Sequence, residues 1–310
     1  MKKLILHIGQ QKTGSTSLQN FLLSNRDHLY QRYGFLYPQP IKGRKHKSLL
    51  HWLKGDRSDE ELHDMIPDHQ GLACLSDENL YNIPREKIQR LYALLKPHFD
   101  LIEIIYFLRR QDRHVISHYQ QKVRGIYASS FKNFIEDDKT RLYYDYYSTY
   151  LKWESIFGAN INIYPYSKDD DIRRVFLRYV VADQVDWTLL IKEETAGHKN
   201  QGIDRRGIEL LKILNKIEND NQSLLPHNLK RRIRVYLKSH PTEDKLSLNP
   251  DQVRRMNELG HNNRLLVKRF PHLAQELTYE SSFINRTENE VQEEITSEEL
   301  FLTFFKSIES

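Results

Sequence analysis

Short apolar runs alternate with helix-type patterns over the first half of the chain. The strongest run is Leu101–Leu108, which is almost continuously apolar, as expected of a strand buried on both faces of a sheet. Apolar residues at helical spacing follow it, from Val115 to Val123. This alternation predicts a three-layer α/β fold, in which helices flank a mostly parallel sheet of about five strands. The expected strands are Leu4–Ile8, Phe35–Tyr37, Leu72–Leu75, Leu101–Leu108 and Ile161–Tyr164.

From about Gly202 the apolar spacing is helical only. Two stripes cover Leu210–Ile217 and Leu229–Leu237, and one long helix is expected from Pro250 to Phe270. We expect a single domain over residues 1–310. It comprises an α/β core at 1–195, a helical part at 196–287 packed on that core, and an acidic tail at 288–310 with a short amphipathic helix.

The charge balance favours anionic partners without identifying one. The chain of 310 residues has 47 Lys and Arg against 42 Asp and Glu, a net charge of +5. Such an excess suits nucleotides, sulfated or phosphorylated sugars, membrane surfaces or nucleic acid. The single cysteine, Cys74, excludes an intramolecular disulfide framework and a multi-cysteine metal site, and we expect a cytoplasmic protein.

Hydropathy gives no membrane-spanning segment. No run of about 18 apolar residues occurs, so only peripheral membrane contact is left open. Met1–Lys3 followed by Leu4–Ile8 imitates a signal peptide, but the apolar run is too short and leads into a loop containing Gly, Lys and Thr. We interpret it as a buried strand.

The segment after this first strand is the most informative part of the chain. Residues 9–19 read GQQKTGSTSLQ and lead from a strand into a helix. A loop of this kind presents backbone N–H groups at a helix N-terminus, where the helix dipole favours an anion. Gly14 permits close approach of a phosphate, and the hydroxyls of Ser15, Thr16 and Ser17 add donors. Thr16 and Gln19 also fit a capping box, an alternative structural use for a hydroxyl.

The loop differs from the nucleotide P-loop at one decisive position. Gly9 and Gly14 have the P-loop spacing and Thr16 stands at its Ser/Thr position, but Ser15 replaces the lysine. The only lysine of the loop is Lys12, two residues before Gly14. This disfavours an ordinary kinase or ATPase. A P-loop kinase or nucleotidase that uses Mg-ATP with a displaced lysine stays as an alternative.

The same residues resemble the sulfotransferases that use 3′-phosphoadenosine 5′-phosphosulfate. Their loop, Lys-[ST]-Gly-[ST]-[ST] directly after the first strand, is matched at every position by the run Lys12-Thr13-Gly14-Ser15-Thr16. The resemblance implies a P-loop-related fold in which residues 12–17, Ser17 included, hold the 5′-phosphosulfate. It also implies that Lys12 contacts the oxygen that bridges to sulfur.

A second stretch resembles the element that binds the 3′-phosphate in this family. Arg109 stands at the end of the strongest predicted strand, and Ser117 follows eight residues later on the next helix. A guanidinium pairs well with a phosphate, although a structural ion pair is the alternative role for Arg109. The third family element is matched loosely by residues 198–202, where Lys199 is the candidate ligand.

The group that activates the acceptor is expected where the third strand ends. The segment 75–80 resembles a Ser-x-Glu-Asn stretch of bacterial carbohydrate sulfotransferases, which makes Glu78 the first candidate for general base. The alternative is that Glu78 caps a turn or pairs with a loop lysine. His46 and His51 are the other candidates, as bases, acceptor-site residues or surface residues.

The resemblance implies an enzyme that moves a sulfuryl group from 3′-phosphoadenosine 5′-phosphosulfate to a hydroxyl or amine by in-line displacement. The product nucleotide would be adenosine 3′,5′-bisphosphate, no metal is expected, and the acceptor would be a glycan or small molecule, neutral or anionic. The non-enzymatic alternative is a basic protein that binds nucleotides or RNA, although no RNA-binding signature is present. Acceptor identity and oligomeric state are not encoded in any motif of the sequence.

Overall fold

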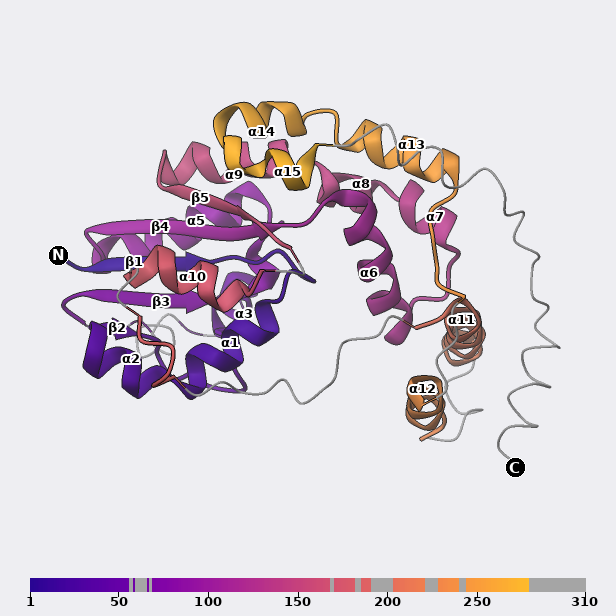
Figure 1. Ribbon diagram of the computed structural model, residues 1–310, viewed down its shortest axis with the longest axis horizontal. Coiled ribbons are helices and arrows are strands. Elements are labelled where there is room, and N and C mark those ends of the chain that lie inside the picture. Colours follow the sequence, from indigo (N-terminus) through magenta and orange to yellow (C-terminus); the bar gives the residue numbers. More distant parts are fainter. Residues whose placement is uncertain are drawn as a thin grey trace. The chain divides into compact units, whose positions relative to one another are not determined.

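A five-stranded, entirely parallel β-sheet organises the first of two compact units (Figure 1). The computed structural model describes residues 1–55, 58, 66, 69–167, 170–181, 185–190, 203–220, 228–239 and 244–278. The strands follow the order β2-β3-β1-β4-β5, so β1 lies at the centre. The expected strands are confirmed to within two residues at each end. They are β1 (Lys3–His7), β2 (Phe35–Leu36), β3 (Leu72–Ser76), β4 (Leu101–Leu108) and β5 (Ile161–Pro165).

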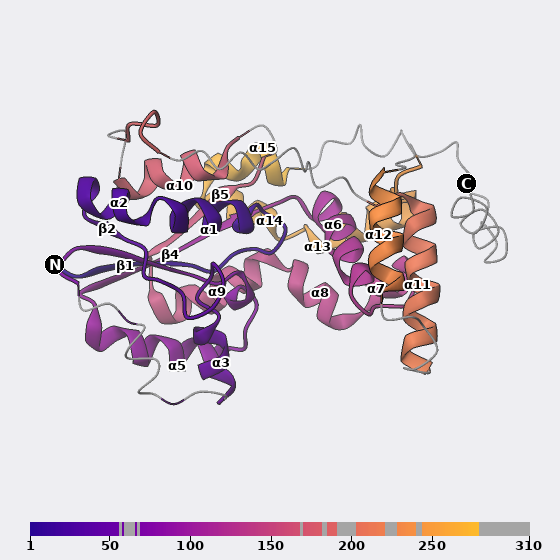
Figure 2. The same ribbon diagram turned by 90° about the horizontal axis from the view of Figure 1, so that it is seen from below.

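Helices cover both faces of this sheet, which confirms the three-layer α/β architecture (Figure 2). One face packs against α1 (Ser15–Ser24), α2 (Arg26–Tyr33) and α10 (Ile172–Val181). The other carries α3 (Ser48–Lys54), α5 (Arg85–Leu95) and α9 (Tyr146–Phe157). Successive strand residues serve opposite layers, since Ile5 belongs to the core under α1 and α10 while its neighbours are equally buried. Fully burying a side chain of this size contributes roughly 1.5–3 kcal/mol, so the sheet is a firm support for its loops.

Shorter helices complete the first unit. Two short 3-10 turns, η1 (Glu78–Leu80) and η2 (Lys96–His98), follow β3 and α5, and α14 (Asn263–Arg269), η4 (Pro271–Leu273) and α15 (Ala274–Leu277) lie beside β5. His272 of η4 bonds through Nε2 to the carbonyl oxygen of Ile163 at 2.6 Å. Glu276 of α15 accepts a hydrogen bond from the backbone N–H of Arg110 at 2.9 Å. The segment from α14 to α15 therefore packs against the β5 edge of the sheet.

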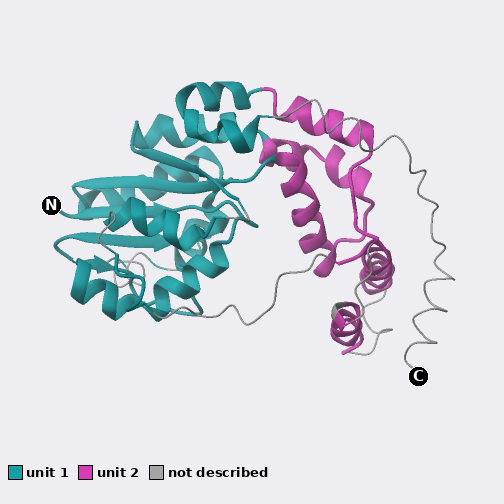
Figure 3. Cartoon of the chain, viewed as in Figure 1, with its two compact units in different colours: residues 1–110, 145–197, 262–278 teal, residues 111–144, 198–261, 279–310 magenta. Residues whose placement is uncertain are grey.

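A second compact unit is helical in its described part (Figure 3). It contains α6 (Gln111–Arg124), α7 (Phe131–Glu136), α8 (Asp138–Tyr144), α11 (Arg205–Asp220), α12 (Leu229–Ser239) and α13 (Pro250–Leu259). Asn215 of α11 donates from Nδ2 to the carbonyl oxygens of Val123 and Tyr127, each at 2.8 Å, which joins α11 to the end of α6. No described helix in either unit is long and apolar enough to cross a membrane.

The division into units differs from the expected one. Residues 111–144, expected within the α/β core, belong to the second unit, and residues 262–278, expected within the helical part, belong to the first. The expected boundary near residue 195 and the tail at 288–310 lie outside the described residues. The chain thus passes between the units several times, which a division by sequence position does not capture.

The expectation of one long helix from Pro250 to Phe270 is wrong. α13 begins as expected at Pro250, and Asn249 and Gln252 form a capping box at its N-terminus. It ends at Leu259, with Gly260 as its C-cap residue. α14 begins at Asn263, and the boundary between the two units falls between the helices. Glycine disfavours a helix interior by about 1 kcal/mol, so it is a natural place for this break.

Candidate functional site

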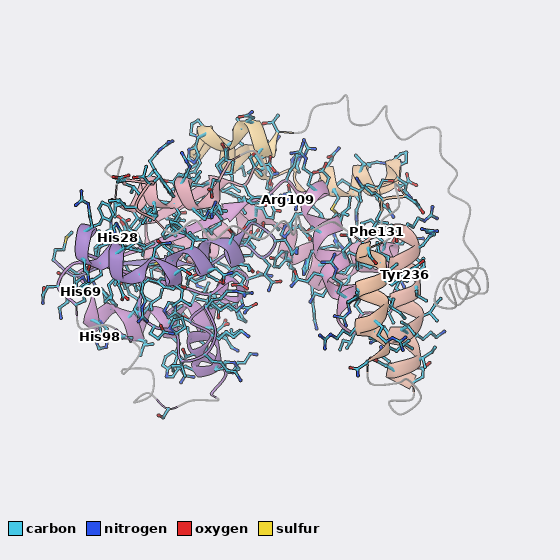
Figure 4. All side chains as sticks on the ribbon, turned by 60° about the horizontal axis from the view of Figure 1, so that its bottom comes forward. His28, His69, His98, Arg109, Phe131 and Tyr236 are labelled. Atoms are coloured by element: carbon cyan, nitrogen blue, oxygen red, sulfur yellow. The ribbon has the colours of Figure 1, made fainter. Side chains whose placement is uncertain are left out.

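The loops after three neighbouring strands meet at the carboxyl edge of the sheet. His7 at the end of β1 is in register with Ser76 of β3 and Ile105 of β4. The predicted loop leaves β1 here, Glu78 follows β3, and Arg109 follows β4. Ligands bind at this edge in open parallel sheets, especially where the chain reverses its direction of winding, as it does around β1. In Figure 4, Arg109 lies at this end of the first unit, whereas His28, His69 and His98 lie at the opposite end.

The loop after β1 has a backbone that only a few residue types tolerate. It is fastened to β4 by the N–H of Phe107, which donates to the carbonyl oxygen of Gly9 at 2.9 Å. Lys12 (φ 65°) and Gly14 (φ 81°) are both left-handed. A Cβ on Gly14 would lie 3.2 Å from side-chain carbons of both Ile172 and Tyr166. The left-handed φ favours glycine at position 14, and a Cβ there would also press on Ile172 and Tyr166.

Gly14 also leaves the start of α1 open. It is the N-cap residue of α1, and no side chain caps the helix. The first N–H groups of an α-helix have no partner within the helix and carry the positive end of its dipole. This end of α1 is therefore suited to an anion.

The structure divides the predicted hydroxyl ligands into two pairs. Thr13 and Ser15 are buried, and both hydroxyls donate to the carbonyl oxygen of Gln10, at 2.6 and 3.2 Å. Thr16 is exposed and Ser17 is half-buried in the first turn of α1. Thr13 and Ser15 thus shape the loop, while Thr16 and Ser17 are the two hydroxyl residues of this set that solvent can reach.

The alternative of a capping box between Thr16 and Gln19 is wrong. Helix α1 begins at Ser15 with Gly14 as its cap, so Thr16 is already within the helix. The Nε2 of Gln19 instead donates to Ser76 Oγ at 3.0 Å and to Glu78 Oε2 at 2.8 Å. Gln19 therefore connects α1 to the end of β3.

Glu78 lies directly beside the loop and is held by two donors. Its Oε2 accepts the bond from Gln19, and its Oε1 lies 2.5 Å from Nζ of Lys45. Its side chain is 16% exposed, and a Cβ on Gly9 would lie 2.9 Å from its carbonyl oxygen. The alternative role of Glu78, pairing with a loop lysine, is therefore realised in the structure.

This pairing decides the charge of Glu78. Burial is the largest single influence and raises the pKa of the carboxyl, but hydrogen bonds from Lys45 and Gln19 and the charge of Lys45 together outweigh it. The net pKa of Glu78 is below its ordinary value, so the group is a carboxylate at neutral pH. Its neighbour Asp77 shows the opposite balance, because burial raises the pKa of Asp77 more than Lys45, 3.5 Å away, lowers it.

A cavity of 840 Å³ opens in front of Glu78. The residues that line it come almost entirely from the segment between β2 and α3 and from α3 itself: Ile41, Lys42, Gly43, Arg44, Lys45, Lys47, Ser48, His51 and Glu78. Of the two histidines considered for the acceptor site, His51 lines this cavity. His46 does not.

His46 is instead a buried anchor. Its Nδ1 accepts a hydrogen bond from the backbone N–H of Ser76 at 3.0 Å, which leaves Nε2 protonated and bonded to the carbonyl oxygen of Pro38 at 3.1 Å. Burial lowers the pKa of His46 from 6.5 to about 4, against weaker opposing effects of these two backbone bonds. The neutral ring therefore fastens the cavity segment to β3.

Arg109 is held at the end of β4, near the β1 loop. Its carbonyl oxygen accepts a hydrogen bond from the hydroxyl of Tyr146 at 2.6 Å, and its guanidinium carbon lies 5.8 Å from the centre of the Tyr166 ring. Tyr166 is also one of the two residues, with Ile172, that a Cβ on Gly14 would approach. Ser117 lies half-buried on α6 in the second unit, and Lys199 lies outside the described residues.

The sequence did not reveal the role of two residues that hold Glu78. It did not single out Lys45, and it indicated Gln19 only as a capping partner. Both act on Glu78 from more than 30 positions away in sequence, so no local pattern could identify them. Tyr166 follows a strand end, which is the one signal that could have marked it.

No protein-family model matches the chain, and no curated protein sequence matches it significantly. Within the described part of the chain, no three His, Cys, Asp or Glu side chains gather as metal ligands. The function of the carboxyl edge of the sheet is therefore inferred from its geometry alone.

Proposed function

We propose that the protein is a sulfotransferase that moves a sulfuryl group from 3′-phosphoadenosine 5′-phosphosulfate to a hydroxyl or amine of a carbohydrate acceptor. The observation that carries the proposal is the loop after β1, where Lys12 and Gly14 are both left-handed and Gly14 precedes a helix without a side-chain cap. Such a loop can hold an anionic group against the backbone with a lysine beside it. The cytoplasm is the proposed compartment, since Cys74 is a buried free thiol.

The residues of the loop and of β4 would hold the donor nucleotide. The donor supplies the activated sulfuryl group, and adenosine 3′,5′-bisphosphate is its other product. Thr16, Ser17 and the open N–H groups of α1 are proposed to bind the 5′ end, and Lys12 to stabilise charge on the departing oxygen. Arg109 is proposed to pair with the 3′-phosphate. Ser117 and Lys199 remain predictions of the sequence for the same nucleotide.

Glu78 is the proposed general base. The acceptor oxygen bonds to sulfur as the bond from sulfur to the 5′-phosphate oxygen breaks, and the hydroxyl proton passes to the carboxylate. The ion pair with Lys45 keeps Glu78 deprotonated and fixes its direction, since both carboxylate oxygens are held by donors. General bases of this kind contribute typically 100- to 10,000-fold to the rate.

Calorimetry tests the nucleotide assignment. We expect adenosine 3′,5′-bisphosphate to bind without magnesium and Arg109→Ala to weaken it by roughly ten- to a hundredfold, the range for hydrogen bonds to charged groups. Lys54→Ala is the matched control, because Lys54 is an exposed lysine of α3 outside the cavity. Binding of Mg-ATP but not of the bisphosphate would refute the proposal in favour of a kinase or nucleotidase.

Turnover with a panel of glycan acceptors tests the catalytic roles. We expect Lys12→Ala and Glu78→Gln to lose turnover, with the affinity of Glu78→Gln for the bisphosphate unchanged. Circular dichroism of both variants controls for folding. A loss of nucleotide affinity in Glu78→Gln would show that the carboxylate is structural, and normal turnover in Lys12→Ala would remove the lysine from the mechanism.

A further inference from the structure

The described lining of the cavity in front of Glu78 carries more positive than negative charge. Four of the lining residues that the structure describes are Lys or Arg, and Glu78 is the one carboxylate among them. Lys45 is already paired with that carboxylate. The other three, Lys42, Arg44 and Lys47, are exposed and form no ion pair with any residue that the structure describes.

The backbone around Lys42, Arg44 and Lys47 is anchored to the rest of the first unit. The hydroxyl of Tyr37 donates to the carbonyl oxygen of Arg44 at 2.8 Å, and the N–H of His46 donates to the carbonyl oxygen of Ser76 at 2.8 Å. The rings of Tyr37 and His46 pack edge to face with centroids 4.9 Å apart. Both rings are buried, so the three cations project from an anchored backbone. Charges ordered in advance cost less entropy to bring to a ligand.

The lining offers few other means of recognising a sugar. None of the described residues that line the cavity is Phe, Tyr or Trp, the side chains on which sugar rings commonly stack. A cavity of 840 Å³ lies in the upper part of the roughly 300–1,000 Å³ range of ligand pockets, which leaves room for more than one sugar ring. Charge is therefore the main feature available for selecting a ligand here.

We propose that this cavity is the acceptor site and that the acceptor is an anionic oligosaccharide, with carboxylate or sulfate groups on the sugars beside the reacting one. The proposal rests on the proposed function. Lys42, Arg44 and Lys47 bind these anions. Glu78, whose charge is balanced by Lys45, accepts a hydrogen bond from an uncharged hydroxyl. The cations and the base thus orient the acceptor, with its anions on Lys42, Arg44 and Lys47 and its hydroxyl towards Glu78.

Binding measurements with defined oligosaccharides test this inference. The probes are a chondroitin sulfate hexasaccharide, a hexagalacturonate that carries carboxylates only, uncharged maltohexaose and a short single-stranded RNA. We expect the two anionic sugars to bind, the uncharged one to bind at least tenfold more weakly, and affinity to fall as salt rises. Comparison of the chondroitin and galacturonate arms shows whether sulfate or carboxylate is preferred.

Charge-reversal variants locate the binding. Lys42→Glu and Lys47→Glu should each weaken the anionic sugars by roughly three- to tenfold, the range for charges near the surface that turn from attractive to repulsive. Lys54→Glu, the same change on an exposed lysine outside the cavity, should leave the affinity unchanged.

Affinity for adenosine 3′,5′-bisphosphate, measured in the same variants, separates this inference from the proposed function. It should be unchanged in Lys42→Glu and Lys47→Glu. If the wild-type protein fails to bind the bisphosphate, the proposed function fails, whatever the sugars do. The inference would be overturned if maltohexaose bound as tightly as the anionic sugars, or if neither anionic sugar bound. It would also be overturned if neither Lys42→Glu nor Lys47→Glu changed the affinity for the anionic sugars, or if the RNA bound more tightly through the same lysines.

Discussion

The buried ring of His46 predicts a specific loss of stability in mild acid. Its pKa is about 4 in the folded protein, against an ordinary 6.5 in the unfolded chain. Between pH 6.5 and pH 4, His46 is protonated in the unfolded state but not in the folded state. The free energy of unfolding therefore falls as the pH drops from 6.5 towards 4. The rate is up to ~1.4 kcal/mol per pH unit, which gives roughly 3 kcal/mol over the window. Below pH 4 both states are protonated and the effect is complete.

Replacement of His46 isolates this contribution. His46→Asn removes the titrating ring but leaves every carboxylate, as well as His7, whose pKa burial also lowers to about 4. We expect wild type to be the more stable protein at pH 7.5, and its advantage to shrink by roughly 2.5 kcal/mol on going to pH 4.5.

Urea unfolding followed by tryptophan fluorescence measures the difference. All three tryptophans, Trp52, Trp153 and Trp187, belong to the sheet unit that contains His46, so the signal reports on the correct part of the chain. A stability gap that stayed constant between pH 7.5 and 4.5 would refute the reasoning. It would mean that His46 titrates in the folded protein as it does in the unfolded chain.

Three further predictions concern other parts of the structure. Gly14→Ala should lower the free energy of unfolding by about 1–2 kcal/mol because of its left-handed φ, and it should also weaken nucleotide binding in calorimetry because its Cβ meets Ile172. Gly34 is also left-handed but has nothing within 4 Å of a Cβ, so Gly34→Ala should lose stability alone. Equal nucleotide affinity in the two variants would contradict this. The Cys74 thiol should not react with a thiol reagent at pH 8 until urea unfolds the protein, because burial raises its pKa; rapid reaction in buffer would disprove its burial. Asn249→Ala should lower the stability of the second unit by about 1 kcal/mol in thermal melts followed by circular dichroism, since it removes the capping box of α13; an unchanged melt would show that this cap contributes nothing.

The α/β class and its strands were predictable because each depends on local pattern. β4 was located to the residue, since eight nearly continuous apolar positions suit a strand buried on both faces. The loop after β1 was also recognisable, because its Lys, Gly and hydroxyl residues lie within one short segment. Its resemblance to the sulfotransferase loop remains a prediction that the nucleotide measurements test.

The features that sequence left open all depend on contacts between distant segments. Whether Glu78 is free or paired was decided by Lys45, 33 residues away, and by Gln19 on α1. His46 looked like a candidate for the acceptor site, but the end of β3 and the carbonyl of Pro38 occupy both of its ring nitrogens. The break between α13 and α14 follows a passage from one compact unit to the other, which helical periodicity does not encode.

The sequence by itself therefore determined the fold class and the order of the strands, and it predicts that the loop after β1 binds an anion. These follow from burial periodicity and from backbone conformations that few residues adopt. Only the tertiary structure decided which carboxylate is held ionised, which histidine is buried and which lysines face a cavity. Charge state and exposure depend on neighbours brought together by folding, and the pattern of residues along the chain does not specify those neighbours.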